Sequence, residues 1–161
     1  MKKHLFFSVL ISGIIVSACT TQCPPLTDSQ KADIEKQIRE TVDSMITTVR
    51  NLDVAGYSAF ISSDDFIAMY SKGSATQSRQ EWIDNAKVRW SQRESQNLDQ
   101  IKVNVTVLTA DYALADRISV WQVTFKNDSI WRFNQVTSYI FKKNPSGWKF
   151  IHYHESLQDI K

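Results

Sequence analysis

The chain has 161 residues, with 19 lysines and arginines against 17 aspartates and glutamates, a formal net charge of +2 at pH 7. Hydrophobic residues make up 42% of it, with only 4 glycines and 3 prolines, a composition that indicates one ordered globular domain. The small basic excess forms no lysine- or arginine-rich cluster, which argues against a nucleic-acid-binding protein, so we expect no nucleic acid as a partner.

The first 18 residues have the layout of an export signal. Lys2 and Lys3 precede an apolar run over residues 5–18, LFFSVLISGIIVSA, that contains no charged side chain. As a helix this run would rise about 21 Å, less than the ~30 Å hydrocarbon core of a bilayer, so it is short for a permanent span. A basic start, a short apolar segment and small residues at its end are typical of a signal peptide.

The end of this segment resembles the lipoprotein box of bacterial lipoproteins, because Val16, Ser17 and Ala18 precede Cys19. The resemblance implies that the Cys19 sulfur receives a diacylglycerol, that cleavage occurs before Cys19, and that the new amino group is acylated, for example with palmitate. Several acyl chains, each gaining about 0.8 kcal/mol per buried CH₂, give stable anchoring. By resemblance to the sorting rule of enterobacterial lipoproteins, Thr20 in place of aspartate implies the outer membrane, facing the periplasm. The alternative is an ordinary signal peptide with a chance cysteine.

We therefore expect three parts in the chain. Residues 1–18 are predicted to be a lipoprotein signal peptide, residues 19–26 a lipidated tether, and residues 27–158 a folded domain. Cys23 is the only other cysteine, and it lies in the tether. We interpret it as an idle tether residue; a free thiol or a disulfide with another chain are the alternatives.

Residues 27–52 are predicted to form a long helix. Their apolar side chains recur at steps of three and four, which places them on one stripe of the helix. Thr27 and Gln30 have the spacing of a capping box. A second, short helix is expected over residues 53–61, with Asp53 as its cap. The residues of the apolar stripe are Ile34, Ile38, Val42, Met45, Val49 and Leu52.

A short strand is expected over residues 66–70, followed by a turn at residues 72–74. Ser78 and Glu81 repeat the capping-box spacing and predict a third helix that ends near Trp90. The residues of this helix that we expect to face the core are Trp82, Ile83, Ala86 and Trp90.

After Asn97 the apolar residues recur with a period of two, which indicates strands with one buried face. Four long antiparallel strands are expected, and the second should be bent or bulged near residues 116–117, where its alternation slips. The strands are predicted at residues 101–107, 112–125, 129–143 and 148–156. In the first of them, four side chains are expected to face the core: Ile101, Val103, Val105 and Val107.

This order of elements predicts an α+β fold in which helices collect on one face of a curved antiparallel sheet and leave a concave pocket. Leu52-Asp53, residues 60–66 and above all residues 147–156, GWKFIHYHES, resemble the nuclear transport factor 2-like superfamily, in particular its SnoaL-like domains and the association domain of calcium/calmodulin-dependent kinase. The resemblance implies a cone-shaped sheet wrapped over a long N-terminal helix and two shorter helices, and a homodimer through the outer sheet face.

The last strand supplies the central candidates for a site. By resemblance to the kinase association domain, the cone interior should receive Ile151, Tyr153 and Glu155. The same resemblance implies that four side chains lie on the outer sheet face: Trp148, Phe150, His152 and His154. Other polar side chains expected at the pocket are Tyr57, Tyr70, Trp90, Arg132 and Gln135.

The superfamily contains isomerases, dehydratases, cyclases, ligand binders and assembly domains, so the fold does not choose a function. We expect binding of a small apolar ligand, or protein association, without catalysis, in a pocket that lacks a close pair of base and proton donor. The alternative is a small isomerase, dehydratase or cyclase acting on an apolar substrate, with Glu155 as base and a tyrosine stabilising an oxyanion. A third interpretation is an assembly subunit with a filled interior.

The last strand also carries two histidines that could bind a metal. His152 and His154 are two residues apart, a spacing at which both can ligate one ion. No third ligand has a clear spacing to them, so we expect neither a metal nor another cofactor.

Replacing Cys19 by serine tests the lipid anchor. Because serine lacks the sulfur that receives the diacylglycerol, Cys19→Ser should carry no lipid and accumulate as uncut precursor, whereas Cys23→Ser should be processed normally. Mass spectrometry of both purified variants measures cleavage and acylation. Normal cleavage of Cys19→Ser would contradict the anchor and favour the ordinary signal peptide.

Overall fold

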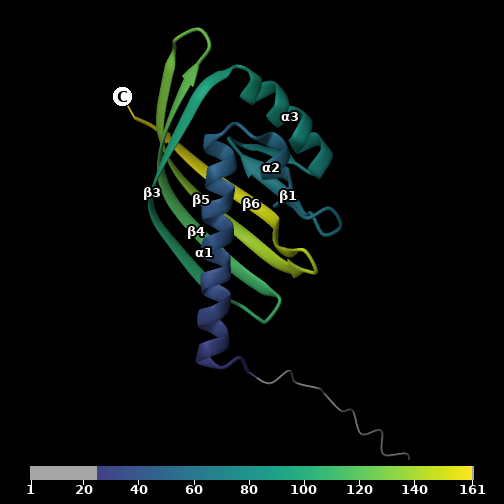
Figure 1. Cartoon of the computed structure of the whole chain (residues 1–161). Coiled ribbons are helices and arrows are strands. Elements are labelled where there is room, and N and C mark those ends of the chain that lie inside the picture. Colours follow the sequence, from purple (N-terminus) through teal and green to yellow (C-terminus); the bar gives the residue numbers. More distant parts are fainter. Residues whose placement is uncertain (1–24, 161) are drawn as a thin grey trace, which may run out of the picture.

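The computed structural model describes residues 25–160, which form three helices and a six-stranded sheet (Figure 1). The signal segment, Cys19 and Cys23 lie outside the described residues. None of the helices in this part of the chain is both long enough and apolar enough to cross a membrane. The elements in chain order are α1 (Asp28–Arg50), α2 (Val54–Ser58), β1 (Ala68–Ser71), β2 (Ser74–Thr76), α3 (Arg79–Ser91), β3 (Arg93–Val107), β4 (Tyr112–Phe125), β5 (Ile130–Asn144) and β6 (Gly147–Asp159).

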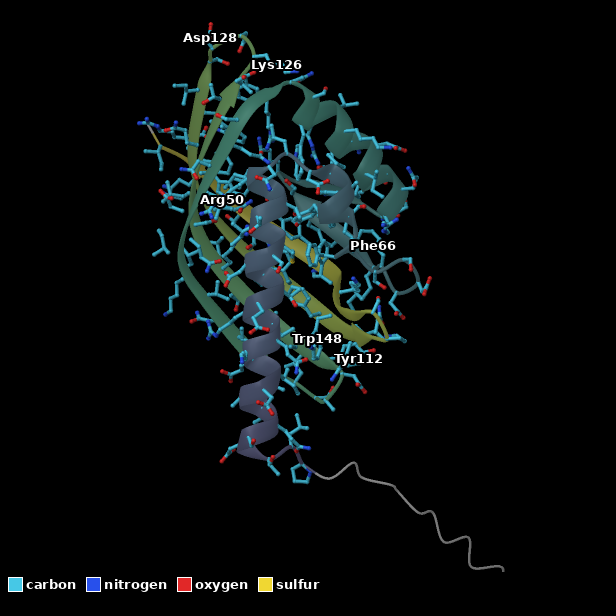
Figure 2. All side chains as sticks on the ribbon, in the orientation of Figure 1. Arg50, Phe66, Tyr112, Lys126, Asp128 and Trp148 are labelled. Carbon is cyan, nitrogen blue, oxygen red and sulfur yellow. The ribbon has the colours of Figure 1, made fainter. Side chains whose placement is uncertain are left out.

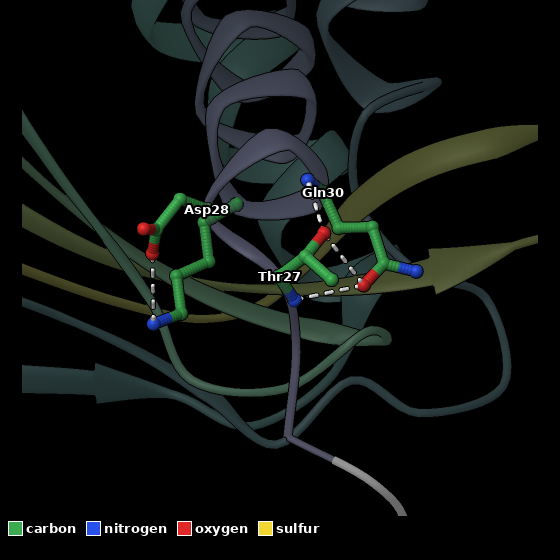
Figure 3. A network of polar contacts seen from close by, with 4 residues as sticks. Thr27, Asp28 and Gln30 are labelled. Carbon is green, nitrogen blue, oxygen red and sulfur yellow. Dashed lines mark hydrogen bonds and ion pairs between the residues drawn. The ribbon is translucent and has the colours of Figure 1, made fainter.

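The start of α1 confirms the predicted capping box (Figure 3). The Thr27 hydroxyl accepts a hydrogen bond from the Gln30 N–H at 3.2 Å, and the Thr27 N–H donates to Gln30 Oε1 at 2.9 Å. These bonds satisfy backbone groups that have no partner within the helix. Asp28 adds a negative charge in the first turn, where the helix dipole favours it, and lies 3.9 Å from the Lys31 ammonium.

The apolar stripe of α1 packs against the concave side of the sheet, and α2 and α3 lie near the C-terminal end of α1 (Figure 1). The predicted stripe is confirmed, except that Leu52 is only partly buried and Ile46 joins the core. The buried residues of the stripe are Ile34, Ile38, Val42, Met45, Ile46 and Val49.

The two short helices begin at the predicted caps. Asp53 accepts a hydrogen bond from the Gly56 N–H at 2.8 Å, and a Cβ atom at Gly56 would lie 2.2 Å from the same carboxylate, so a side chain there would displace the cap. Ser78 accepts from the Glu81 N–H at 3.1 Å, while the Glu81 carboxylate receives the N–H of Gln77. In α3 the buried residues are Trp82, Ala86 and Trp90.

The strand order in the sheet is β2-β1-β6-β5-β4-β3. The predicted antiparallel meander of four long strands is confirmed by β3, β4, β5 and β6. Two features were not predicted from the sequence: β2 pairs with β1, and β1 runs parallel to β6. These short strands bring segments from before and after the meander together on one edge.

β3 begins earlier than predicted and contains a bulge between Gln100 and Lys102. A bulge inserts one residue and changes which side chains face the core. As a result Ile101 is 64% exposed, and the expectation that it is buried was wrong. Val103 and Val105 are partly buried against the core, as the alternation predicts.

β4 keeps its alternation through the whole strand, so the predicted slip near residues 116–117 was wrong. Its pairing with β5 has no register shift. Arg117 and Ser119 occupy the buried face together with the apolar residues before and after them. The polar character of these two residues, not an irregular backbone, caused the apparent slip.

β6 carries a bulge opposite Ile140 and Phe141, and this corrects the predicted facing of its first half. Trp148 and Phe150 lie in the core rather than on the outer sheet face. The Trp148 indole donates to Gln37 Oε1 on α1 at 3.0 Å, at the opposite end of the sheet from Asp128 in the β4–β5 turn (Figure 2). Beyond the bulge, Tyr153 is buried.

Replacing Ile38 by alanine tests the packing of α1 on the sheet. The Ile38 side chain is fully buried, so Ile38→Ala should lower the free energy of unfolding by about 2–5 kcal/mol. The matched control Ile101→Ala removes an exposed side chain and should change it by less than about 0.5 kcal/mol. Urea unfolding measures both, and equal effects would contradict the described core.

Candidate functional site

A cavity of about 210 Å³ lies between the sheet and the C-terminal end of α1, α2 and α3. Aromatic side chains form much of its wall. The Tyr57 and Trp82 rings are stacked with centroids 4.9 Å apart, and those of Trp121 and Phe133 with centroids 5.7 Å apart. Trp90 packs edge-on against Trp82. The wall is therefore largely aromatic.

Polar side chains occupy the centre of the sheet face that lines this cavity. The register aligns Arg117 of β4, Thr137 of β5 and Glu155 of β6 in one row across three strands. Ser119 and Gln135 form the next row along. All are buried except Glu155, which is half-buried. The alternation of the strands thus concentrates hydrogen-bonding groups on a face that is otherwise apolar.

Gln135 connects the positive and the negative group of this face. Its Oε1 accepts hydrogen bonds from Arg117 Nη2 at 2.8 Å and from Trp121 Nε1 at 2.7 Å, while its Nε2 donates to the Glu155 carboxylate. Only this orientation of the amide works, because guanidinium and indole groups donate and a carboxylate accepts. Arg117 and Glu155 therefore interact through an amide and form no direct ion pair.

The Glu155 carboxylate accepts three hydrogen bonds. The Ser71 hydroxyl donates to Oε1, and the Tyr153 hydroxyl and Gln135 Nε2 donate to Oε2. The donors come from β1, β6 and β5, so the pairing of β1 with β6, which was not predicted, completes the site. A carboxylate in contact with a tyrosine hydroxyl is the close pair that our non-catalytic interpretation did not expect.

Burial changes the pKa of two tyrosines and one arginine at the cavity. Burial, together with the nearby Glu155 carboxylate, raises the pKa of Tyr153 well above its usual value. Burial and the neighbouring Tyr139 raise the pKa of Tyr57 in the same way. Both hydroxyls stay protonated at neutral pH. Burial and the adjacent Arg89 lower the pKa of Arg93 to about 10, which leaves its guanidinium charged at neutral pH.

The charge around the cavity is strongly unbalanced. Among the described residues, Glu155 is the one acidic residue that lines it. Four basic residues line it as well: Lys72, Arg89, Arg93 and Arg117. Among residues 25–160 the ion pairs involve other basic residues, so none of these four has a carboxylate partner there.

Most of the side chains expected at the pocket lie at this cavity: Tyr57, Trp90, Gln135, Tyr153 and Glu155. Two others do not. Tyr70 is 41% exposed and lies against His152, its ring centroids 5.6 Å apart, because the neighbouring Met69 takes the inward position. Arg132 is exposed and donates to Gln122 Oε1 at 2.9 Å, because Phe133 takes the inward position.

Several polar side chains of the site were missed from the sequence, among them Ser71, Arg93 and Arg117. The signal for Arg117 was present, since it has the same parity along β4 as Ala115 and Trp121. Ser71 was not identifiable, because its place depends on the β1–β6 pairing. Within the described part of the chain, no group of three or more His, Cys, Asp and Glu side chains is arranged to hold a metal ion.

Comparisons with known proteins place the chain in a family. The model of the SnoaL-like domain matches residues 38–159. No curated protein sequence matches the chain significantly. Among solved structures, a candidate scytalone dehydratase from Novosphingobium aromaticivorans is similar with a TM-score of 0.73 at 8% identity, over 84% of this chain and 89% of that chain.

Two further structures have the same fold. A hexachlorocyclohexane dehydrochlorinase from Novosphingobium barchaimii gives a TM-score of 0.69 at 10% identity, over 83% of this chain and 94% of that chain. A nuclear transport factor 2-like superfamily protein from Salmonella enterica gives a TM-score of 0.71 at 13% identity, over 78% of this chain and 92% of that chain. Likeness at such identities shows the fold alone. With the family match and the curved sheet over α1, this chain belongs to the SnoaL-like domains of the nuclear transport factor 2-like fold.

Proposed function

We propose that this protein binds a small molecule in the cavity, without catalysis, while a lipid on Cys19 holds it at the outer membrane facing the periplasm. The observation that carries the proposal is the cavity of about 210 Å³ with aromatic walls around a preformed polar network. Apolar pockets with a few convergent polar groups are typical of ligand sites. An assembly subunit with a filled interior would leave no such space.

The size of the cavity suits a small ring compound. An apolar cavity of about 150 Å³ is known to admit benzene. The larger volume here leaves room for one substituted ring. Stacked and edge-on aromatic residues on the wall, such as Tyr57, Trp82 and Trp90, match the flat faces of such a ring.

The state of Glu155 favours binding over catalysis. A general base needs a lone pair that faces the substrate. Three of the roughly four lone-pair positions of the Glu155 carboxylate already accept from Ser71, Gln135 and Tyr153, and the Tyr153 hydroxyl directs its proton to this carboxylate. Among the described residues that line the cavity, none is a histidine, an aspartate or a cysteine.

The outer face of the sheet supports a homodimer as part of the proposal. Ile118 and Val136 are directly paired on β4 and β5 and are 38% and 48% exposed. Adjacent exposed apolar side chains at the centre of a sheet are suited to burial against a second copy of the chain. Such a dimer leaves the cavity, on the opposite face, free to take a ligand.

Filling the cavity tests ligand binding. Leu157→Trp adds bulk at a lining position of β6, whereas Gln158→Trp adds the same bulk at the next, exposed residue. Native mass spectrometry of the full chain should detect a bound small molecule in the unaltered protein and in Gln158→Trp, with occupancy about tenfold lower in Leu157→Trp. Circular dichroism checks that both variants fold. Equal occupancy in both would place the ligand elsewhere, and no bound molecule in any would contradict the proposal.

The contact of Tyr153 with Glu155 favours a second candidate, a small lyase. The similar structures include a candidate dehydratase and a dehydrochlorinase. If this chain eliminates water or HCl from its ligand, Glu155→Gln should lower kcat by about 10²-fold or more while binding persists. Under the binding function that we propose, neither the unaltered chain nor Glu155→Gln should convert the bound molecule. Product formed by the unaltered chain and lost in Glu155→Gln would establish the enzyme instead.

A further inference from the structure

The guanidinium of Arg117 is the most unusual charged group that faces the cavity. Arg117 is 3% exposed and sits in the middle of the sheet. Gln135 Oε1, a neutral acceptor, takes the hydrogen bond from its Nη2, and its Nε has no partner among the described residues. Buried charges in folded proteins are normally paired and fully hydrogen-bonded, because removal from water is costly. Because Arg117 lines the cavity and its one hydrogen-bond acceptor among the described residues is neutral, its guanidinium favours an anionic group that arrives with a ligand.

Glu155 does not serve as the counter-ion of Arg117. Gln135 lies between the two groups, and the carboxylate already accepts from Ser71 and Tyr153 as well. A single carboxylate with three donors of its own cannot balance four cations. The cavity therefore keeps an excess of positive charge that faces its empty volume.

Two further arginines extend this positive region toward the rim of the cavity. Arg93 is half-buried, and its Nε also has no partner in the described part of the chain. Arg89 lines the same cavity, and its charge, after burial, lowers the pKa of Arg93. Two like charges that approach each other in a partly buried place are stabilised when an anion lies between or beside them. Arg93 and Arg89 therefore favour the same kind of ligand as Arg117.

We infer that the cavity takes a small aromatic carboxylate, with its ring against the aromatic wall and its carboxylate on Arg117. This inference names the ligand class of the binding function proposed above and rests on it. A planar carboxylate matches the planar, multi-donor edge of a guanidinium. It differs from the uncharged apolar ligand expected from the sequence, because the buried Arg117 was not recognised there.

Three probes of nearly the same shape separate the effect of charge from that of size. Benzoate, benzamide and benzamidine carry charges of −1, 0 and +1 on the same ring. Calorimetric titration of the full chain in detergent at pH 7 measures their affinities. Benzoate should bind at least about tenfold more tightly than benzamide, and benzamidine most weakly, because a charged hydrogen bond is worth at least that factor.

Two variants assign the preference to the cavity. Arg117→Gln should weaken benzoate by at least about tenfold and change benzamide by less than about threefold. Arg132→Gln is the matched control, since Arg132 lies on the neighbouring strand and is exposed on the outer face. It should leave all three affinities unchanged. If Arg117→Gln does not fold, the salt dependence of the unaltered chain still tests the inference. Added salt should weaken the binding of benzoate and not that of benzamide.

The outcomes separate the inference from the function on which it rests. Benzamide binding as tightly as benzoate would overturn the anionic ligand and leave small-molecule binding intact. No measurable binding of any probe would overturn the aromatic carboxylate, whereas the binding function is overturned only if native mass spectrometry also detects no bound molecule. A loss of benzoate binding in Arg132→Gln equal to that in Arg117→Gln would also overturn the assignment to Arg117.

Discussion

Arg117 keeps a positive charge on the inner face of the sheet, where the side chains of its own strand are otherwise small or apolar. A charge in that place has to be hydrogen-bonded, and Gln135 meets the requirement with the one amide orientation that also satisfies Trp121 and Glu155. The network spans β4, β5 and β6 in register. The shape of the cavity and the position of its polar groups follow from this arrangement.

Three other parts of the fold also shape the cavity: the bulge in β6, the short strand β1 and the helices. The bulge in β6 places Phe150 in the core and still returns Tyr153 and Glu155 to the inner face. β1 pairs in parallel with β6 and brings Ser71 to the carboxylate. α1 covers the concave side of the sheet, and the cavity lies near its C-terminal end, beside α2 and α3.

Local patterns predicted much of this structure. The capping box at Thr27 and the stripe of α1 follow from short-range spacing, and the four long strands follow from a period of two. Bulges and long-range pairing leave no such local signal, so the exposure of Ile101 and the buried position of Phe150 were not predictable. Arg117 differs from both. Its position along β4 predicts an inward-facing side chain, but we did not assign it to the core because arginine is charged.

The central claim is that the Arg117 guanidinium stays without a charged partner until a ligand supplies one. The Nε–H signals of arginine side chains in ¹⁵N NMR spectra report on the guanidinium group directly. The signal that disappears in Arg117→Gln is the signal of Arg117. Addition of benzoate should shift the Arg117 Nε–H signal and slow its exchange with water, while benzamide shifts it far less. A signal that benzoate leaves unchanged, at concentrations at which benzoate binds, would contradict the account.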